Sequence, residues 1–574
     1  MNPSRHLTTR RQRVAGVACM LGMLLSVQPG VVGAQSGAPG AGSLMKEMTP
    51  STKTPAAAGA PDLALPRAVA APLVGGPTLR VAGFRLAGLD ESRAQALLPL
   101  LARYIGDGKT LIDLEDAAKD VEVALQRQGL FLAQVFVPEQ TLQDGVVVLQ
   151  VLEGRIGQVT LRADDGVRVD AAMMDRFLDP LRNHPVATRE RVERALFALG
   201  DLRGVEITSA LEPGQRTGHA DLTVRVAPGA RAAFEAGFDN GGSIFTGRYR
   251  LTGSADWLSP TGRGDSLSIK ALASTNGGVV FARAAWLTPV GSVGTKFGLA
   301  ASALSYKLGS PVFEPLQASG TGQALGVQLL HPARRARNSN LFLQAGFDHR
   351  RFADDVDAID LRSRKSVASY VSLGAVGDFR DTLGGGGISN YAVNLVTGRL
   401  SFKSADDIAV DQASYQTAGS YAKLVLTASR LQALPNKDHL YLSAQAQFAG
   451  KDLDSSEKQS LGGPSGVRAY PAPDTPSDSA VIVGWEYRKT LPIEAYPGDW
   501  VLGLFGDYAV GRQHESPLPA DTDNVRRLVG HGLGLTYASR AGLLVKGWVA
   551  VRGGRPAQSD DSRARAYVQL SQQF

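Results

Sequence analysis

The chain has 574 residues, of which 44% are hydrophobic and 20% charged, so it is too long for one ordinary domain and too apolar for a disordered protein. Its formal net charge is +7, but the first 34 residues hold four arginines and no acidic residue. Removing those four from the 61 basic residues leaves 57 against 54 acidic ones, an excess of only 3. This balance does not favour nucleic-acid binding.

Residues 1–34 have the pattern of a secretory signal peptide. The arginines form a basic start, the stretch from Val14 to Val27 is apolar, and small residues lie at 32–34. Cys19, the single cysteine, falls inside this segment, so the exported chain is expected to contain no thiol or disulfide. No later segment reaches the roughly 20 apolar residues of a spanning helix. The mature protein is therefore either soluble or a membrane barrel, the other fold that satisfies every backbone group in lipid.

Residues 35–77 are rich in Ala, Gly and Pro and are predicted to form a linker. Within it, Ser43–Met48 can form a single helical turn, which makes the segment a candidate pore plug.

Hydrophobic periodicity and turn residues predict the order β-α-α-β-β in residues 78–155, with elements at 79–86, 91–105, 111–127, 132–137 and 146–152. The same order returns in residues 156–228, with elements at 159–162, 170–178, 188–199, 205–211 and 220–226. Two units of matching order and length form an internal structural repeat. Placed after a signal peptide, the repeat indicates tandem periplasmic interaction domains.

From 229 to 574 the helical periodicity gives way to short segments that alternate apolar and polar residues, as in His439–Phe448. Sixteen such strands are predicted, near 231–240, 247–258, 264–274, 279–287, 295–307, 319–331, 340–353, 365–378, 386–400, 413–429, 438–449, 479–489, 500–511, 525–538, 542–552 and 563–574. This pattern, with the terminal aromatic Phe574, is typical of an antiparallel transmembrane β-barrel. A soluble β-sandwich gives the same alternation but explains neither the signal peptide nor so many consecutive strands.

One connection in the predicted barrel is unusually long. Asp452–Pro471 lies between the strands at 438–449 and 480–489, and its glycines and prolines exclude a strand or a helix of any length. Connections of this length without regular structure are uncommon and usually functional. Arg468 and Tyr470 lie at its tip.

These features resemble a known family. Three stretches, at 238–242, 246–250 and 264–267, look like the start of the barrel in two-partner secretion transporters, the haemolysin and filamentous-haemagglutinin secretion/activation family of the Omp85 superfamily. The long loop is similar to that family's sixth extracellular loop, through residues 453–458, Gly462, Gly463 and Gly466, and the sequence Val467-Arg468-Ala469-Tyr470. The family's common core is Val-Arg-Gly-Tyr, so Ala469 departs from it and leaves the tip geometry open. Residues 505–511 resemble the strand motif that accompanies the loop.

The resemblance implies two POTRA domains, at 78–155 and 156–228, and a 16-stranded barrel at 229–574 whose loop 450–478 folds into the pore. Strand alternation places Asp507 and Glu486 on the lumen side of the two strands that follow the loop. A desolvated pair of arginine and carboxylate is strong and directional. In the family the loop arginine is thought to reach the strand aspartate, so Asp507 is the expected partner of Arg468 and Glu486 the second choice.

The resemblance also implies a function, which is export of an unfolded partner exoprotein of the haemolysin, adhesin or toxin type through a barrel in the outer-membrane lipid that is expected to be monomeric. The first POTRA domain is expected to contribute much of the recognition, through the edge of strand 132–137 and a groove at helix 111–127. Candidate contact residues are Leu132, Val135, Val137, Val121 and Leu125. Two alternatives are an assembly factor for outer-membrane proteins, which usually has three or five periplasmic domains, and a general porin, which needs no tandem domains.

Motifs of catalysis and cofactor binding are missing from the sequence. The eight histidines include no pair at metal-ligand spacing. Gly106–Thr110 ends like a phosphate loop, but Arg103 stands where that motif needs glycine. The sequence therefore predicts a protein that is not an enzyme and has no metal, cofactor or nucleic-acid partner.

Overall fold

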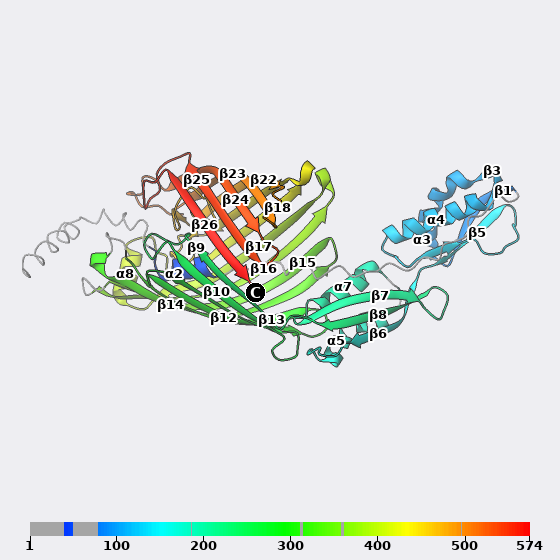
Figure 1. The fold of residues 1–574 in the computed structure, drawn as a ribbon, viewed down its shortest axis with the longest axis horizontal. Helices are drawn as coiled ribbons and strands as arrows, with labels where there is room; N and C mark the ends of the chain where they lie inside the picture. The colour runs from blue at the N-terminus through cyan, green and yellow to red at the C-terminus, as the bar shows by residue number, and fades with distance from the viewer. Residues whose placement is uncertain are drawn as a thin grey trace, which may run out of the picture.

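The computed structural model describes residues 39–49, 78–184, 186, 188–309, 314–356, 361–494 and 496–574. Two small mixed domains extend in a row from one end of a barrel (Figure 1). We call this end of the barrel the near rim and the opposite end the far rim. The predicted signal peptide and most of the predicted linker lie outside the described residues.

The barrel closes through sixteen antiparallel strands in chain order, with β26 meeting β9. The strands are β9 (Ala232–Asp239), β10 (Arg250–Leu258), β11 (Ser266–Ser274), β12 (Val279–Val290), β13 (Thr295–Lys307), β14 (Ala318–Arg335), β15 (Ser339–Val356), β16 (Leu361–Asp381), β17 (Gly387–Phe402), β18 (Gly419–Ala433), β19 (His439–Ala449), β22 (Ser479–Leu491), β23 (Asp499–Arg512), β24 (Val525–Ala538), β25 (Leu543–Arg552) and β26 (Ala564–Gln573). The predicted 16-stranded barrel is confirmed, and each predicted strand overlaps an observed one.

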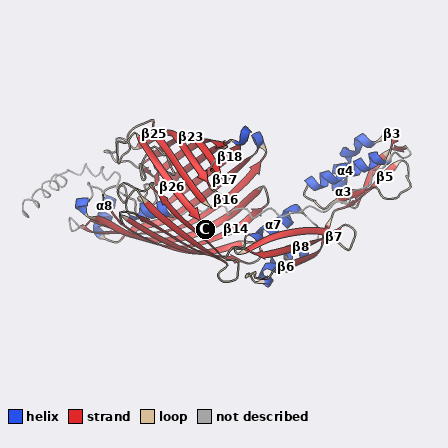
Figure 2. Ribbon diagram, viewed as in Figure 1, coloured by secondary structure: helices blue, strands red, loops and turns tan. Residues whose placement is uncertain are grey.

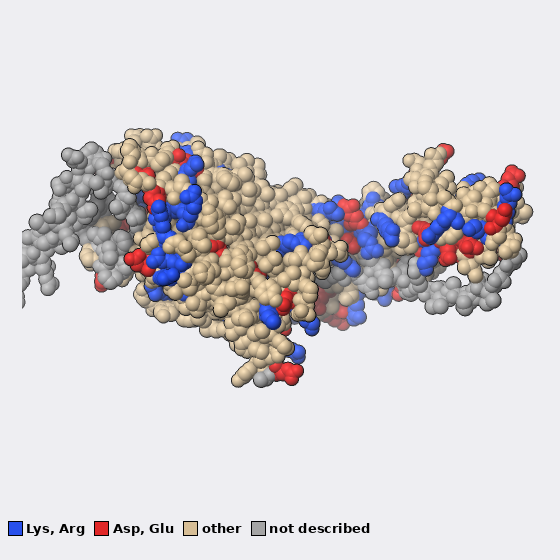
Figure 3. All heavy atoms as spheres, turned by 90° about the horizontal axis from the view of Figure 1, so that it is seen from above, with Lys and Arg blue, Asp and Glu red and all other residues tan. Residues whose placement is uncertain are grey.

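Alternation along each strand sorts the side chains between the two faces of the wall. On β23, Leu502, Leu504 and Tyr508 are exposed on the outer face, whereas Phe505 and Ala509 are buried on the lumen side. Apart from short helices the barrel is built of strands (Figure 2). On the face drawn in Figure 3, few charged side chains lie over the middle of the wall, and Lys and Arg gather toward the far rim. The ladder that joins β26 to β9 is the shortest in the barrel, with five residue pairs.

The first domain has a three-stranded sheet of order β2-β5-β4 and a separate pair of β1 with β3. Its elements are β1 (Leu79–Val81), β2 (Gly83–Ala87), α3 (Glu91–Leu97), η1 (Leu98–Tyr104), β3 (Gly106–Lys109), α4 (Leu111–Arg127), β4 (Gln134–Phe136) and β5 (Val146–Leu152). A capping box of Thr110 and Asp113 begins α4. The buried face of α4 packs on the apolar side of β5, which forms the core of the domain.

The second domain repeats this plan, with β6 parallel to β8 and β7 antiparallel to it. Its elements are β6 (Arg155–Ala163), α5 (Ala171–Arg176), α6 (Asp179–Asn183), α7 (Arg189–Gly200), β7 (Val205–Pro213) and β8 (His219–Pro228). Thr188 caps α7 by accepting a hydrogen bond from the backbone N–H of Arg191. The apolar side of α7 is buried against the sheet.

A buried ion pair joins the second domain to the near rim. Asp201, which follows α7, accepts a hydrogen bond of 3.0 Å from Nε of Arg335, at the end of β14. The Arg335 side chain is fully buried, donates to Asn340 at 2.7 Å, and lies between the rings of Phe197 and Phe342. A buried arginine with its hydrogen bonds filled makes this a specific junction.

The structure differs from the predicted elements in places where tertiary contacts override local pattern. The strand predicted at 79–86 divides at Ala82, whose N–H donates to the carbonyl of Gly145, so that its two halves join different sheets. Pro99 lies where the helix predicted at 91–105 becomes the 3₁₀ helix η1. The turn after helix α8 (Ala405–Gln412) occupies residues 413–418, so the strand predicted at 413–429 begins only at Gly419. None of the helices in the described residues is long and apolar enough to cross a membrane.

Candidate functional site

The connection between β19 and β22, residues 450–478, turns back into the barrel lumen. It contains a short ladder of β20 (Gln459–Ser460) with β21 (Pro476–Ser477), which corrects the prediction that it has no regular structure. Gly463 has a φ of +102°, and the backbone at Gly466 leaves no room for a side chain beside the carbonyl of Leu461. The loop therefore needs glycine at both positions to fold so tightly.

Arg468 at the loop tip contacts two carboxylates on the barrel wall. Its Nε and Nη2 donate to the two oxygens of Asp507 on β23, both at 2.9 Å, and its backbone N–H donates to the same group at 3.1 Å. Its Nη1 donates to Glu486 on β22 at 2.6 Å. Its guanidinium also lies 3.5 Å from the ring centroid of Phe505. This places Arg468 between both predicted partners, with the bidentate contact on Asp507.

The residues after Arg468 attach the loop tip to β24, to β26 and to the connection between β25 and β26. The Tyr470 hydroxyl donates to the carbonyl of Arg555 at 2.9 Å, and the carbonyl of Tyr470 accepts from the Tyr567 hydroxyl at 2.9 Å. Ala469 lies against Gly530 on β24, where an added Cβ would be 2.7 Å from that of Ala469. The alanine that departs from the family pattern therefore fits because the wall has a glycine opposite it.

The base of the loop carries a second group of buried charges. Glu457 is paired with Lys423 on β18 at 2.6 Å and lies 3.7 Å from Arg350 on β15. Lys46 approaches the same place, and its ammonium donates to the carbonyls of Glu457 and Lys458 at 2.9 and 2.6 Å. Three basic side chains thus surround one carboxylate in the lumen.

Lys46 belongs to a short helix, α2 (Ala41–Met48), that lies inside the barrel (Figure 1). Ala41, Leu44 and Met45 are buried in an apolar cluster with side chains of the wall. The backbone N–H of Ala41 donates to Asp354 on β15 at 2.8 Å. The turn predicted at Ser43–Met48 is therefore part of a helix docked on the lumen face of the wall.

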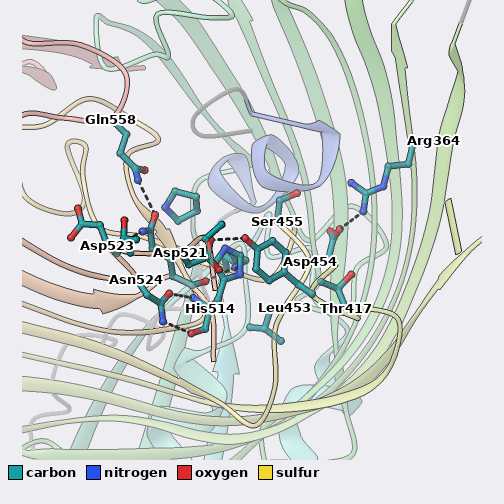
Figure 4. A pocket seen from close by; sticks show the side chains of 16 residues that line it. Arg364, Thr417, Leu453, Asp454, Ser455, His514, Asp521, Asp523, Asn524 and Gln558 are labelled. Atoms are coloured by element: carbon teal, nitrogen blue, oxygen red, sulfur yellow. Dashed lines mark hydrogen bonds and ion pairs between the residues drawn. The ribbon is translucent and has the colours of Figure 1, made fainter. Parts of the chain in front are cut away.

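A cavity of about 460 Å³ lies beside the base of the loop (Figure 4). Its lining includes Leu453, Asp454 and Ser455 of the loop and Asp521 and Asn524 of the connection after β23. Across it, Asp454 pairs with Arg364 on β16 at 3.4 Å. The cavity thus separates the loop from two other parts of the barrel, so the loop is only partly packed on this side.

Next to this cavity, Asp452, Asp478 and His514 bring possible metal-ligand atoms within 4.8 Å of one another, a grouping among the described residues that the sequence did not reveal. The Lys458 ammonium already lies 3.0 Å from Asp478 and 3.3 Å from Nδ1 of His514. Burial lowers the pKa of His514 to about 4, and the nearby Lys458 ammonium adds to this effect. Nδ1 of His514 also lies 3.3 Å from Asp452, so the group is a network of polar contacts in which the Lys458 ammonium is already paired with Asp478.

The geometry defines a class of protein: a 16-stranded β-barrel that holds a loop and a helix in its lumen and carries two small β-α-α-β-β domains at one rim. The model of the haemolysin secretion/activation protein ShlB/FhaC/HecB family matches residues 218–537, more than half of the chain, and the ShlB-type POTRA domain model matches residues 79–154. The chain belongs to the ShlB/FhaC/HecB family of haemolysin secretion/activation proteins. The predicted family and outer-membrane location are confirmed, and the near rim and both small domains face the periplasm.

Individual relatives agree with this assignment. The heme/hemopexin transporter protein HuxB of Haemophilus influenzae is 27% identical over 456 residues, which cover 78% of this chain and 79% of HuxB. The outer membrane transporter CdiB of Dickeya dadantii is 25% identical over 473 residues, covering 81% and 80% of the two chains. The solved structure of CdiB from Escherichia coli aligns with a TM-score of 0.69 at 21% identity, over 89% of this chain and 92% of that one. At that identity the structural likeness supports the fold.

The predicted substrate contacts need correction. Val121 and Leu125 are fully buried and Val135 is buried in the same core, because they are the inward-facing side chains of α4 and β4. Leu132, in the turn before β4, is buried in the core of the second domain. Val137 is partly buried against the same core as Val121. Leu132 also lines a cavity of about 330 Å³ together with Gln134 and residues 213–220 of the second domain, whereas Val121, Leu125, Val135 and Val137 pack in the core of the first domain. The exposed apolar side chains of this domain include Leu111 and Ile112 at the start of α4 and Phe136 on β4.

Sequence reasoning missed the contacts that join α2 to the loop and the wall. Lys46, Asp354 and Glu457 are far apart in the chain, and no motif relates them. The only signal was a short helix-compatible stretch with one lysine inside an Ala/Gly/Pro-rich segment.

Proposed function

We propose that this transporter exports a large secreted partner of the haemolysin, adhesin or toxin type, and that α2 and the loop 450–478 close its lumen between transport events. The observation that carries the proposal is that both segments lie inside the barrel while neither belongs to its wall. Both are held by side-chain contacts that can be broken without unfolding a strand. One relative carries the name heme/hemopexin transporter, and others the name outer membrane transporter CdiB.

In this proposal Arg468 is the lock of the loop. Its contacts with Asp507 and Glu486 are made by one side chain on two neighbouring strands, so withdrawing the loop breaks all of them together. Tyr470 and Val467 are fully buried and add apolar contact at the same place. These contacts stabilise the docked loop, and all of them are lost at the tip when the loop is released.

The helix α2 is coupled to the loop through Lys46. When the loop is in place, the carbonyls of Glu457 and Lys458 accept hydrogen bonds from the Lys46 ammonium, and the Glu457 carboxylate offsets the positive charge nearby. Withdrawal of Glu457 leaves Lys46 facing Lys423 and Arg350, and like charges at close range repel. Movement of the loop therefore weakens the docking of α2.

Recognition of the unfolded partner is assigned to the first POTRA domain. Strand β4 lies at the edge of its sheet, and the N–H of Val135 on the open side donates to Glu122 at 3.4 Å. An extended segment can add to this edge by replacing Glu122, with Phe136 exposed beside it. The folding of the partner outside the cell then favours outward movement, because a folded chain cannot return.

Deletion of residues 78–228 tests the export function against its alternatives. The shortened protein is expected to insert as a barrel and to lose secretion of a large partner protein. A general porin would conduct small solutes normally without these domains. If the protein were an assembly factor, the deletion would instead lower the amounts of other outer-membrane proteins and would leave secretion of a partner protein unchanged. Either result contradicts the proposal.

A reversible tether tests the role of α2. A Cβ placed on Gly40 would lie 3.6 Å from Cγ of Asp354, so cysteines at these two positions are close enough to form a disulfide. In a background with Cys19 replaced by serine, the Gly40→Cys/Asp354→Cys pair should block secretion when oxidised and restore it when a reductant is added. Each single variant is the matched control. Full secretion by the oxidised pair shows that α2 need not leave the lumen.

A further inference from the structure

On β14–β17 the outer face of the wall changes from apolar to polar and basic side chains toward the far rim. On β15 the outward side chains Leu343 and Phe347 are exposed and apolar, and His349 and Arg351 follow on the same face. On β16 the same face ends in the exposed Lys365, which lies opposite Ala353. The apolar surface that suits lipid chains thus gives way to basic side chains while the strands continue.

These basic side chains line one hollow. It has a volume of about 500 Å³ and is bordered by Arg351, Lys365 and Lys403, with His349, Gln323 and Thr321 beside them. Lys403 follows β17, and its backbone N–H donates to the carbonyl of Lys365 at 3.0 Å, which brings the ends of the two strands together. Three cations, on β15, on β16 and directly after β17, therefore converge on one concave surface.

Among the described residues, no carboxylate neutralises the cations of this hollow. Arg351 contacts His349, whose Nε2 accepts from its Nε at 3.3 Å. No ion pair with a described carboxylate joins Arg351, Lys365 or Lys403, and none of the described residues lining the hollow is acidic. By contrast, Arg350 and Arg364, which neighbour them in sequence but face the lumen, both lie near carboxylates of the loop. The described residues therefore leave these three outer-face cations without a carboxylate partner.

The hollow lies beyond the apolar part of the outer face of β15. Arg351 lies four residues beyond Phe347 along β15, and with a rise of about 3.3 Å per residue and a tilt of about 40° this is about 10 Å above it. The far rim is the cell-surface end, so the hollow lies on the cell-surface side of the exposed apolar side chains Leu343 and Phe347.

We propose that this hollow binds a phosphate group on the headgroup of a phosphorylated glycolipid of the outer leaflet. Arginine matches phosphate oxygens with paired donors, and the two lysines add point charges around them. The apolar side chains below, such as Phe347, suit the acyl chains of the same molecule. The bound lipid lies across the wall from α2, because Phe352 and Asp354 on the lumen side of β15 contact that helix.

Native mass spectrometry of the purified full-length protein in detergent tests the proposal, with bisphosphorylated lipid A as the probe. The matched lipid lacks both phosphates, and inorganic phosphate is added as a competitor. The test variant is Arg351→Gln/Lys365→Gln/Lys403→Gln. The matched control, Arg248→Gln/Arg527→Gln/Arg563→Gln, removes three exposed basic side chains elsewhere. A third variant, Arg351→Lys/Lys365→Arg/Lys403→Arg, keeps every charge.

The test variant should bind bisphosphorylated lipid A on the order of 100-fold more weakly than the native protein, because each basic side chain near an anionic lipid surface contributes several-fold. The control and the charge-keeping variant should bind within about threefold of the native protein. The lipid without phosphates should bind as weakly to the native protein as the phosphorylated one does to the test variant. Equal binding of both lipids, or an unchanged affinity in the test variant, overturns the proposal. Displacement by millimolar inorganic phosphate assigns the hollow to free phosphate and also overturns it.

Discussion

Replacing Arg468 with alanine should release the loop 450–478 from the wall. The substitution removes two contacts with Asp507, one with Glu486 and the ring contact with Phe505. Glu486 keeps a second partner, Arg488, at 2.8 Å, whereas Asp507 is left buried without a cation. Most of the loss is therefore expected at Asp507.

The size of the effect follows from that orphaned charge. Removing one member of a buried ion pair destabilises the state that contains it by about 3–5 kcal/mol. In the undocked state water reaches Asp507, so this difference acts on the docking equilibrium of the loop and not on the barrel. It corresponds to a population of the undocked loop that rises by about 10²- to 4 × 10³-fold.

The absence of other cysteines makes this equilibrium measurable. With Cys19 replaced by serine, Val467→Cys introduces a single thiol that is fully buried when the loop is docked. Its rate of reaction with a maleimide then reports how often the loop leaves the wall. We expect Arg468→Ala to raise that rate by about 10²-fold or more. Arg488→Ala, the matched control on the wall, should change it less than about threefold because its side chain is partly exposed.

A double-mutant cycle with Asp507→Ala completes the experiment. Because both side chains belong to one contact, the double variant should be little worse than Arg468→Ala, with a coupling energy of about 2–3 kcal/mol. Labelling rates that stay at the native value, or effects of the two substitutions that simply add, refute the pairing as the lock. Secretion measured on the same variants then shows whether loop release assists or impairs export.

The remaining predictions concern the loop tip, the domain junction and a helix cap. Gly530→Ala should speed labelling at position 467, because its new Cβ would crowd Ala469, and Ala469→Gly in the same chain should restore the slow rate. Arg335→Ala should weaken docking of the second POTRA domain by about 3–5 kcal/mol through the orphaned Asp201, seen as faster hydrogen exchange in β14 near the rim; unchanged exchange contradicts this. Asp113→Asn should reduce hydrogen-exchange protection in α4 at neutral pH. Hydrogen bonds at the cap lower the pKa of Asp113, so its contribution is present above the unfolded pKa and is lost as pH falls through the folded one; a difference that persists in acid counts against the cap.

The barrel could be predicted because its signal is local. Alternation in the strand that became β23 assigns Asp507 to the lumen without knowledge of any neighbour. The same rule, together with the resemblance of the loop motif to the family, predicted that Arg468 would lie near Asp507 and Glu486. Burial in the POTRA core also followed helical spacing, but the interpretation of Val121 and Leu125 as a groove was wrong, because a periodic apolar stripe marks the face that is covered.

Contacts between distant segments could not be predicted in the same way. The helix α2 is only eight residues long, and an isolated helix of that length is marginal in water, so its stability comes from Met45, Leu44 and their partners on the wall. The pairing of Ala469 with Gly530 likewise depends on the register of β24 and the depth of the loop. No spacing in the chain relates these residues.

The sequence by itself determined the number and order of the strands, the repeated domain before them, and the face of the wall on which each side chain lies. These follow from periods of a few residues, which are set by backbone geometry. Only the tertiary structure decided which lumen groups meet. It placed Arg468 on both Asp507 and Glu486, put Lys46 beside Glu457, and gathered Arg351 with Lys365 and Lys403 on the outer wall. Such contacts depend on how strands tilt and pair around a closed barrel, which is a property of the whole chain.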